Sequence, residues 1–120
     1  MPLVEVSYRP GVAGDVLLRL AEVLPHAVSL AVECPEEPYD GALRPGDVEI
    51  LFRRREALDR SGVDVLVEVR SKWFASRAET MQRRTDELYR AMVEATGSHS
   101  VGVYLSLPVA AWAQGERTGS

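Results

Sequence analysis

The chain begins Met1-Pro2-Leu3-Val4-Glu5-Val6-Ser7-Tyr8, and this stretch organises the rest of it. β-Branched Val4 and Val6 alternate with polar residues, which predicts a strand with one buried face. Proline suits the first position of a strand because its missing N–H is not needed there. Methionine before a small residue such as proline is normally removed in the cell, and we expect that removal here. It would leave Pro2 with a free secondary amine held in place by a strand.

The composition predicts one soluble domain. The chain has 120 residues, of which 46% are hydrophobic and 27% charged, enough to bury a core without metals or disulfides. We expect a single domain over residues 2–115 and a flexible tail over residues 116–120. A net charge of −4 argues against nucleic-acid binding. No stretch predicts a membrane span or a signal peptide, and the single cysteine, Cys34, fits a reducing compartment such as the cytoplasm.

Periodicity predicts two helices and three further strands. Polar residues spaced three and four apart, Ser29 among them, form the polar face of a helix predicted over 13–33, kinked at Pro25 but continuous. The capping-box pattern Ser76-Arg77-Ala78-Glu79 predicts the start of a second helix that ends at Gly97. Alternating apolar residues predict strands over 47–55, 63–72 and 101–107, and residues 35–46 predict a loop.

The predicted order is β-α-β-β-α-β and contains a short repeat. Leu3-Val4-Glu5-Val6 recurs as Leu66-Val67-Glu68-Val69, and each copy precedes a turn, a helix and a strand. Right-handed crossovers would place both helices on one face of a four-stranded sheet, an α+β fold. The other face would need a cover, which favours self-association. Two families share this order: the ferredoxin-like domain, often a small-molecule binding module, and the tautomerase superfamily.

Pro2 favours the second family, and over nearly its full length the chain resembles the tautomerase superfamily. The segment Val67 to Arg77 is similar to the corresponding segment of 5-carboxymethyl-2-hydroxymuconate isomerases, in which a lysine ends the strand and an arginine opens the second helix. The strand Val103-Tyr104-Leu105-Ser106 followed by Trp112 resembles the ending of longer members, including malonate semialdehyde decarboxylases. The resemblance implies a homotrimer that works without a metal or cofactor.

The resemblance also implies a mechanism. A free prolyl nitrogen would act as general base, taking a proton next to a carbonyl and returning it elsewhere on a small 2-oxo or enol carboxylate. An α-amino group has an ordinary pKa of about 8, and a general base works best with a pKa near the working pH. Cations would hold the substrate carboxylate and stabilise the developing enolate.

Three cations are candidates for holding that carboxylate. Arg77 matches the family arginine at the start of the second helix, and Arg70 falls where the third strand meets the proline in relatives. Lys72 ends the same strand. The alternative is that Arg70 and Lys72 are solvated strand-end charges and that Arg77 is simply a residue of the first helical turn.

Four further residues are candidates of a different kind. Arg9 lies near the arginine used by 4-oxalocrotonate tautomerases, but a turn residue is an equal interpretation. Tyr104 matches a pocket tyrosine of the macrophage migration inhibitory factor branch, and Trp112 could close the pocket across a subunit boundary or cap the core. Glu49 stands where 4-oxalocrotonate tautomerases have an arginine. It could activate water, or it could be an outward-facing strand residue.

Three functions therefore stay open. The first is a tautomerase or isomerase that uses Pro2 as base. The second is hydration-linked dehalogenation or decarboxylation on the same scaffold, with Glu49 acting on water. The third is a non-catalytic ferredoxin-like binding module.

Overall fold

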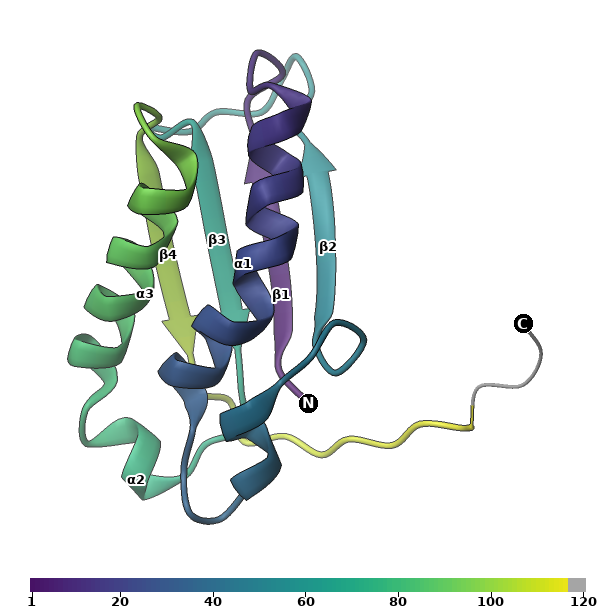
Figure 1. Ribbon diagram of the computed structural model, residues 1–120, viewed down its shortest axis with the longest axis vertical. Helices are drawn as coiled ribbons and strands as arrows, with labels where there is room; N and C mark the ends of the chain where they lie inside the picture. The colour runs from purple at the N-terminus through teal and green to yellow at the C-terminus, as the bar shows by residue number, and fades with distance from the viewer. Residues whose placement is uncertain (117–120) are drawn as a thin grey trace.

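The structure is a computed structural model that describes residues 1–116. Its elements follow the predicted order, with two short additions: a 3-10 helix in the loop and a short helix before the second long one (Figure 1). The second and third strands are one or two residues shorter at each end than predicted, and the fourth ends one residue earlier. The elements are β1 (Leu3–Tyr8), α1 (Gly14–Val32), η1 (Pro38–Ala42), β2 (Glu49–Arg54), β3 (Val65–Arg70), α2 (Ala75–Ala78), α3 (Met81–Thr96) and β4 (Val101–Ser106).

The four strands form one mixed sheet in the order β2-β1-β3-β4. β1 pairs in parallel with β2, β3 pairs in parallel with β4, and the two halves meet where β1 runs antiparallel to β3. In a ferredoxin-like split β-α-β unit, another strand lies between the two that a helix connects. Here the connected strands are direct neighbours. The α+β prediction with two β-α-β halves is confirmed, and the ferredoxin-like alternative is wrong for the fold.

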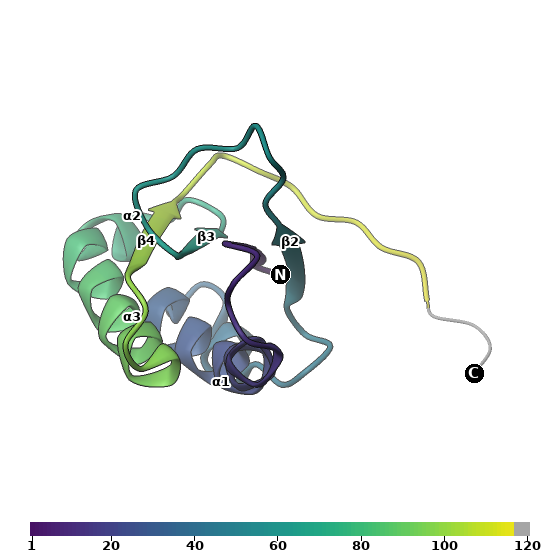
Figure 2. The ribbon, with the colours of Figure 1, turned by 90° about the horizontal axis from the view of Figure 1, so that it is seen from above.

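One face of the sheet is covered by α1 and α3, which lie side by side on it (Figure 2). The inward positions of the two central strands are fully apolar, and burying them removes that surface from water. Five of these valines are at most 2% exposed: Val4, Val6, Val65, Val67 and Val69.

Helix α1 continues through Pro25, as predicted. The assignment of Ser29 to its polar face is wrong, because Ser29 is 1% exposed. Its hydroxyl donates to the carbonyl of Pro25 at 3.1 Å and accepts the N–H of Leu43 at 2.8 Å. A buried hydroxyl needs such partners, and here they fix the loop after α1 against the helix.

The second helical region differs from the prediction at its start. The capping box does not form: no side chain caps α2, and the hydroxyl of Ser76 donates to Glu36 at 2.8 Å instead. A separate helix, α3, begins at Met81. It ends at Gly97, whose φ of 73° is the left-handed conformation that favours glycine at this position.

The second face of the sheet carries no helix. The strand register places alternate residues of all four strands on it, among them the exposed Leu3, Leu51 and Tyr104. The segment after β4 has no regular structure up to residue 116 and runs away from the domain on this side (Figure 2). Most of the tail predicted over 116–120 lies outside the described residues. No helix within residues 1–116 combines the length and the apolar character that crossing a bilayer requires.

Candidate functional site

A cavity of about 490 Å³ lies beside the chain start that precedes β1. Met1 lines it, and Pro2, the next residue, is buried. The charged and aromatic groups around the cavity come from four other segments: Tyr39 and Asp40 from η1, Asp47 from the loop before β2, Lys72 from just after β3, and Trp112 from the segment after β4. Met1 is therefore set among two acids and a cation.

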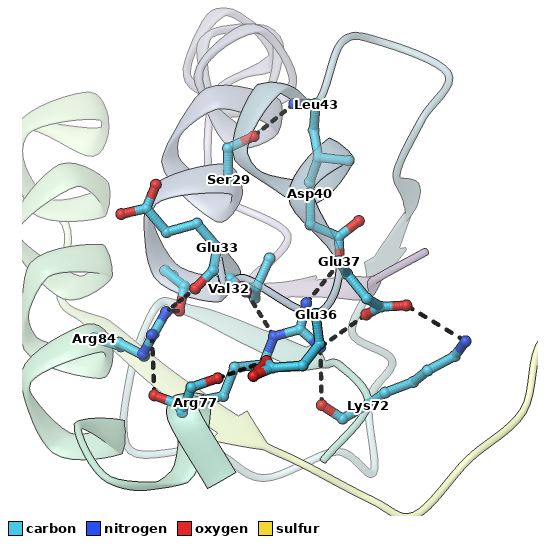
Figure 3. Close-up of polar contacts among 12 residues, drawn as sticks. Ser29, Val32, Glu33, Glu36, Glu37, Asp40, Leu43, Lys72, Arg77 and Arg84 are labelled. Carbon is cyan, nitrogen blue, oxygen red and sulfur yellow. Dashed lines mark hydrogen bonds and ion pairs between the residues drawn. The ribbon is translucent and has the colours of Figure 1, made fainter. Parts of the chain in front are cut away.

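Beside this cavity lies a cluster of four buried or half-buried charges, shown in Figure 3. Arg77 is 0% exposed. Its Nη1 donates to Glu37 Oε1 at 2.9 Å, and its Nη2 donates to Asp40 Oδ2 at 2.7 Å. Lys72 reaches Glu37 Oε2 from the cavity side at 3.5 Å.

Backbone carbonyls take up the remaining donors of Arg77. Nε donates to the carbonyl of Val32 at 2.6 Å, and Nη1 also donates to the carbonyl of Lys72 at 2.9 Å. The guanidinium thus joins the end of α1, the loop after it and the end of β3. Arg77 was expected to hold a substrate carboxylate, but a guanidinium that is fully buried and occupied by protein groups does not fit that role. In this subunit it stabilises the fold.

A second buried arginine completes the cap on α1. Arg84, 8% exposed, donates through Nη1 to the carbonyls of Ala31 and Glu33 at 3.0 and 2.8 Å. The last carbonyls of a helix have no partner within it, and a cation there also interacts favourably with the helix dipole. Because α1 has no basic residue in its last turn, Arg77 and Arg84 satisfy these carbonyls from the second half of the chain.

The pKa values of the two carboxylates that share Arg77 are shifted in opposite directions. Burial acts to raise the pKa of Glu37, but the hydrogen bond and charge of Arg77, with the charge of Lys72, outweigh it and lower that pKa. Burial dominates at Asp40 and, with the charge of Glu37, raises its pKa above the ordinary range. The difference has a geometric cause: both oxygens of Glu37 face a cation, whereas only one oxygen of Asp40 does.

A second, smaller hollow of about 270 Å³ lies on the open face of the sheet. Glu49, Arg70 and Trp112 line it together with Leu3. Nε of Arg70 donates to Glu68 at 3.1 Å, and its side chain remains half exposed. Trp112 lines both hollows. The structure thus brings four of the predicted residues close to the chain start: Glu49, Arg70, Lys72 and Trp112.

Two predicted residues lie elsewhere. Arg9 follows the far end of β1 and pairs with Asp64 at 2.9 Å. Six strand residues separate it from Pro2, a span of roughly 20 Å, so the interpretation as a turn residue fits within one subunit. Tyr104, on β4, is 63% exposed on the open face and lines neither of the two hollows.

The sequence reasoning missed Glu37, Asp40 and Arg84. Glu37 and Asp40 lie in a segment read as a loop, in which acidic residues are ordinarily solvated. The available signal was spacing: an acid at 37 and another at 40, placed between a helix end and a strand, on a segment with three prolines that restrict its backbone. Among residues 1–116, no group of His, Cys, Asp and Glu side chains is arranged to hold a metal ion.

No protein-family model and no curated protein matches the sequence. Solved structures match the fold over most of the chain. One is a malonate semialdehyde decarboxylase, studied for its decarboxylase and hydratase activities, with a TM-score of 0.62, 16% identity, and coverage of 95% of this chain and 91% of that one. Another is a fused 4-OT in a symmetric trimer, with a TM-score of 0.60, 18% identity, and coverage of 89% and 85%.

A third similar structure is MIF2 of Leishmania major, with a TM-score of 0.56, 13% identity, and coverage of 93% of both chains. The fold of this chain is that of the tautomerase superfamily. The expectation drawn from Pro2 and the element order is confirmed at this level.

Proposed function

We propose that the chain is a cofactor-independent tautomerase that shifts a proton on a small 2-oxo or enol carboxylate. Removal of Met1 would free the Pro2 amine to act as general base. The observation that carries the proposal is the cavity at the chain start, lined by Met1 and Lys72. Its volume of about 490 Å³ is in the range of small-molecule sites.

The exposed fraction of each side chain decides which cations we assign to the substrate carboxylate. Lys72 lines the cavity and keeps 30% of its side chain exposed, so its ammonium can hold a carboxylate in addition to Glu37. Arg70 lies in the adjoining hollow with a side chain 51% exposed. We assign the substrate carboxylate to Lys72 and Arg70 and omit Arg77. Trp112, between the two hollows, supplies an apolar wall that excludes water and strengthens these interactions.

We also propose a homotrimer assembled through the open face of the sheet. This face presents exposed Leu51 and Tyr104, and Val109 beyond β4 is 96% exposed. Apolar residues gathered on one face mark interaction surfaces. The symmetric trimer of the fused 4-OT, which has the same fold, supports this assembly. The half-exposed Arg70, Tyr104 and Trp112 would then lie at subunit boundaries.

A second candidate is hydration or decarboxylation on the same scaffold. Carboxylates adjoin both hollows: Asp40 in the first, and Glu49 in the second. A carboxylate beside a substrate can direct water, as proposed for Glu49. Glu49 is exposed on the open face, so this role depends on its being enclosed by a neighbouring subunit.

The reaction products separate the two candidates. The purified protein should accelerate the enol–keto exchange of phenylpyruvate above the buffer rate, measured by ultraviolet absorbance. It should release neither halide from 3-haloacrylates nor carbon dioxide from malonate semialdehyde at a comparable rate. Halide or carbon dioxide as the main product, with exchange at the buffer rate, would reject the tautomerase and support the second candidate.

A further inference from the structure

Asp40 has a carboxylate oxygen without a partner. The residue is 1% exposed, and its Oδ2 accepts a hydrogen bond from Arg77 Nη2 at 2.7 Å. Its other oxygen, Oδ1, is buried and finds no hydrogen-bond donor among residues 1–116. A buried polar atom left unpaired destabilises the folded state, so such an atom calls for an explanation. The pairing with Arg77 fixes the carboxylate and prevents it from turning away.

The groups around Asp40 narrow the choice of donor. Met1, Asp47 and Lys72 are the charged or chain-terminal groups that line the cavity with it. The Lys72 ammonium lies 3.5 Å from Glu37 Oε2 and donates no hydrogen bond to Asp40 Oδ1 in the described part of the chain. Asp47 is an acceptor that already holds the N–H of Arg44 at 3.0 Å. Met1, in contrast, lines the same cavity as Asp40, and the positive charge of its amino terminus lowers the pKa of Asp40 against the rise that burial causes. Within residues 1–116, the amino terminus is therefore a cationic donor beside this cavity for which the structure shows no hydrogen-bond partner.

We propose that Asp40 is a positioning residue for the N-terminal amine: once Met1 is removed, its Oδ1 accepts the N–H of Pro2. This inference rests on the proposed function. A neutral secondary amine has one N–H and one lone pair. If the N–H is held by Asp40, the lone pair is directed away from the carboxylate and toward the cavity.

The proton balance follows from this geometry. When the lone pair takes a proton from the substrate carbon, the C–H electrons pass into the enolate and the prolyl nitrogen becomes an ammonium with two N–H groups. One stays on Asp40 Oδ1, and the other returns its proton to the product. The nearby carboxylate also favours the charged amine. It thus opposes Lys72 and Arg77, which disfavour that charge.

The test compares Asp40→Asn with Asp47→Asn. The acid limb of the kcat/KM profile reports ionisation in the free protein. For Asp40→Asn we expect it to move to lower pH by about one unit, a tenfold change in the amine equilibrium, while kcat falls more than KM changes. Asp47 lines the same cavity, and Asp47→Asn should leave the acid limb of the kcat/KM profile at its wild-type pH. An unchanged limb in Asp40→Asn would overturn the proposal.

A titration of the unsubstituted protein covers the case in which Asp40→Asn does not fold. The ¹³C carboxyl signal of Asp40 should respond at the pH at which the ¹⁵N signal of Pro2 titrates, and this response should vanish when Met1 is retained. Independent titration of the two signals would refute the role of Asp40. Because the readout needs no turnover, coupled signals in a protein without exchange activity would reject the proposed function alone.

Discussion

Replacing Arg77 by methionine should lower the free energy of unfolding by about 3–5 kcal/mol. Methionine fills part of the same volume but leaves Asp40 as a buried carboxylate without its cation and leaves Glu37 with only the partly exposed Lys72. It also removes the donor to the carbonyl of Val32 at the end of α1. Losing one member of a buried ion cluster is costly because the remaining charges stay desolvated. Denaturant unfolding followed by circular dichroism measures the effect.

The control is Arg83→Met. The Arg83 side chain on α3 is 68% exposed, and its Nε lies 4.0 Å from Glu87 Oε1. An exposed pair of this kind contributes less than about 1 kcal/mol. Arg77→Lys is a second variant, which keeps the charge but loses the planar fork of donors. Its loss of unfolding free energy should lie between those of Arg77→Met and Arg83→Met. If the free energy of unfolding of Arg77→Met lay within about 1 kcal/mol of the wild-type value, Arg77 would not be needed for the fold. It would then again be a candidate for binding substrate.

Blocking the amine of Pro2 should reduce the rate of enol–keto exchange by at least about 100-fold, the lower end of what a general base contributes. With a residue permanently in front of it, the Pro2 nitrogen is an amide, whose lone pair is delocalised and cannot accept the proton. Pro2→Ala tests the secondary amine itself, because alanine also exposes an amine after methionine removal but lacks the ring that fixes it. Its rate should fall between those of the wild type and the blocked protein.

Pro10→Ala is the matched control, since Pro10 is an exposed proline in the turn after β1. It should keep the wild-type exchange rate. All variants should show the same circular dichroism spectrum, because the ring of Pro2 contributes no hydrogen bond to the sheet. A blocked protein with full exchange activity would remove Pro2 from the mechanism.

The fold could be predicted because its signals are local. Val4, Val6, Val67 and Val69 alternate with polar residues, and that alternation depends only on which face of a strand is buried. The repeat of Leu-Val-Glu-Val then placed the two β-α-β halves. What the order of elements did not decide was the pairing of strands, which separates this sheet from the ferredoxin-like one.

The site was less predictable because it depends on contacts between distant segments. Arg77 meets Glu37 and Asp40 across 40 and 37 residues of sequence, and no periodicity links them. An arginine at the start of a helix has the same sequence pattern whether it faces a substrate or a buried carboxylate. The prediction for Ser29 was wrong for a related reason. Its spacing fits the polar face of α1, but the loop after the helix folds back and covers it.

The central claim is that Pro2 carries a free and reactive amine, and the mass of the N-terminal peptide tests it most directly. The purified protein is treated with 2-oxo-3-pentynoate, an acetylenic 2-oxo acid to whose triple bond an amine can add, and is then digested and analysed by mass spectrometry. We expect a peptide that begins at Pro2 and carries one equivalent of the reagent on its amine. A peptide that begins at Met1, or one that begins at Pro2 but remains unlabelled, would contradict the claim.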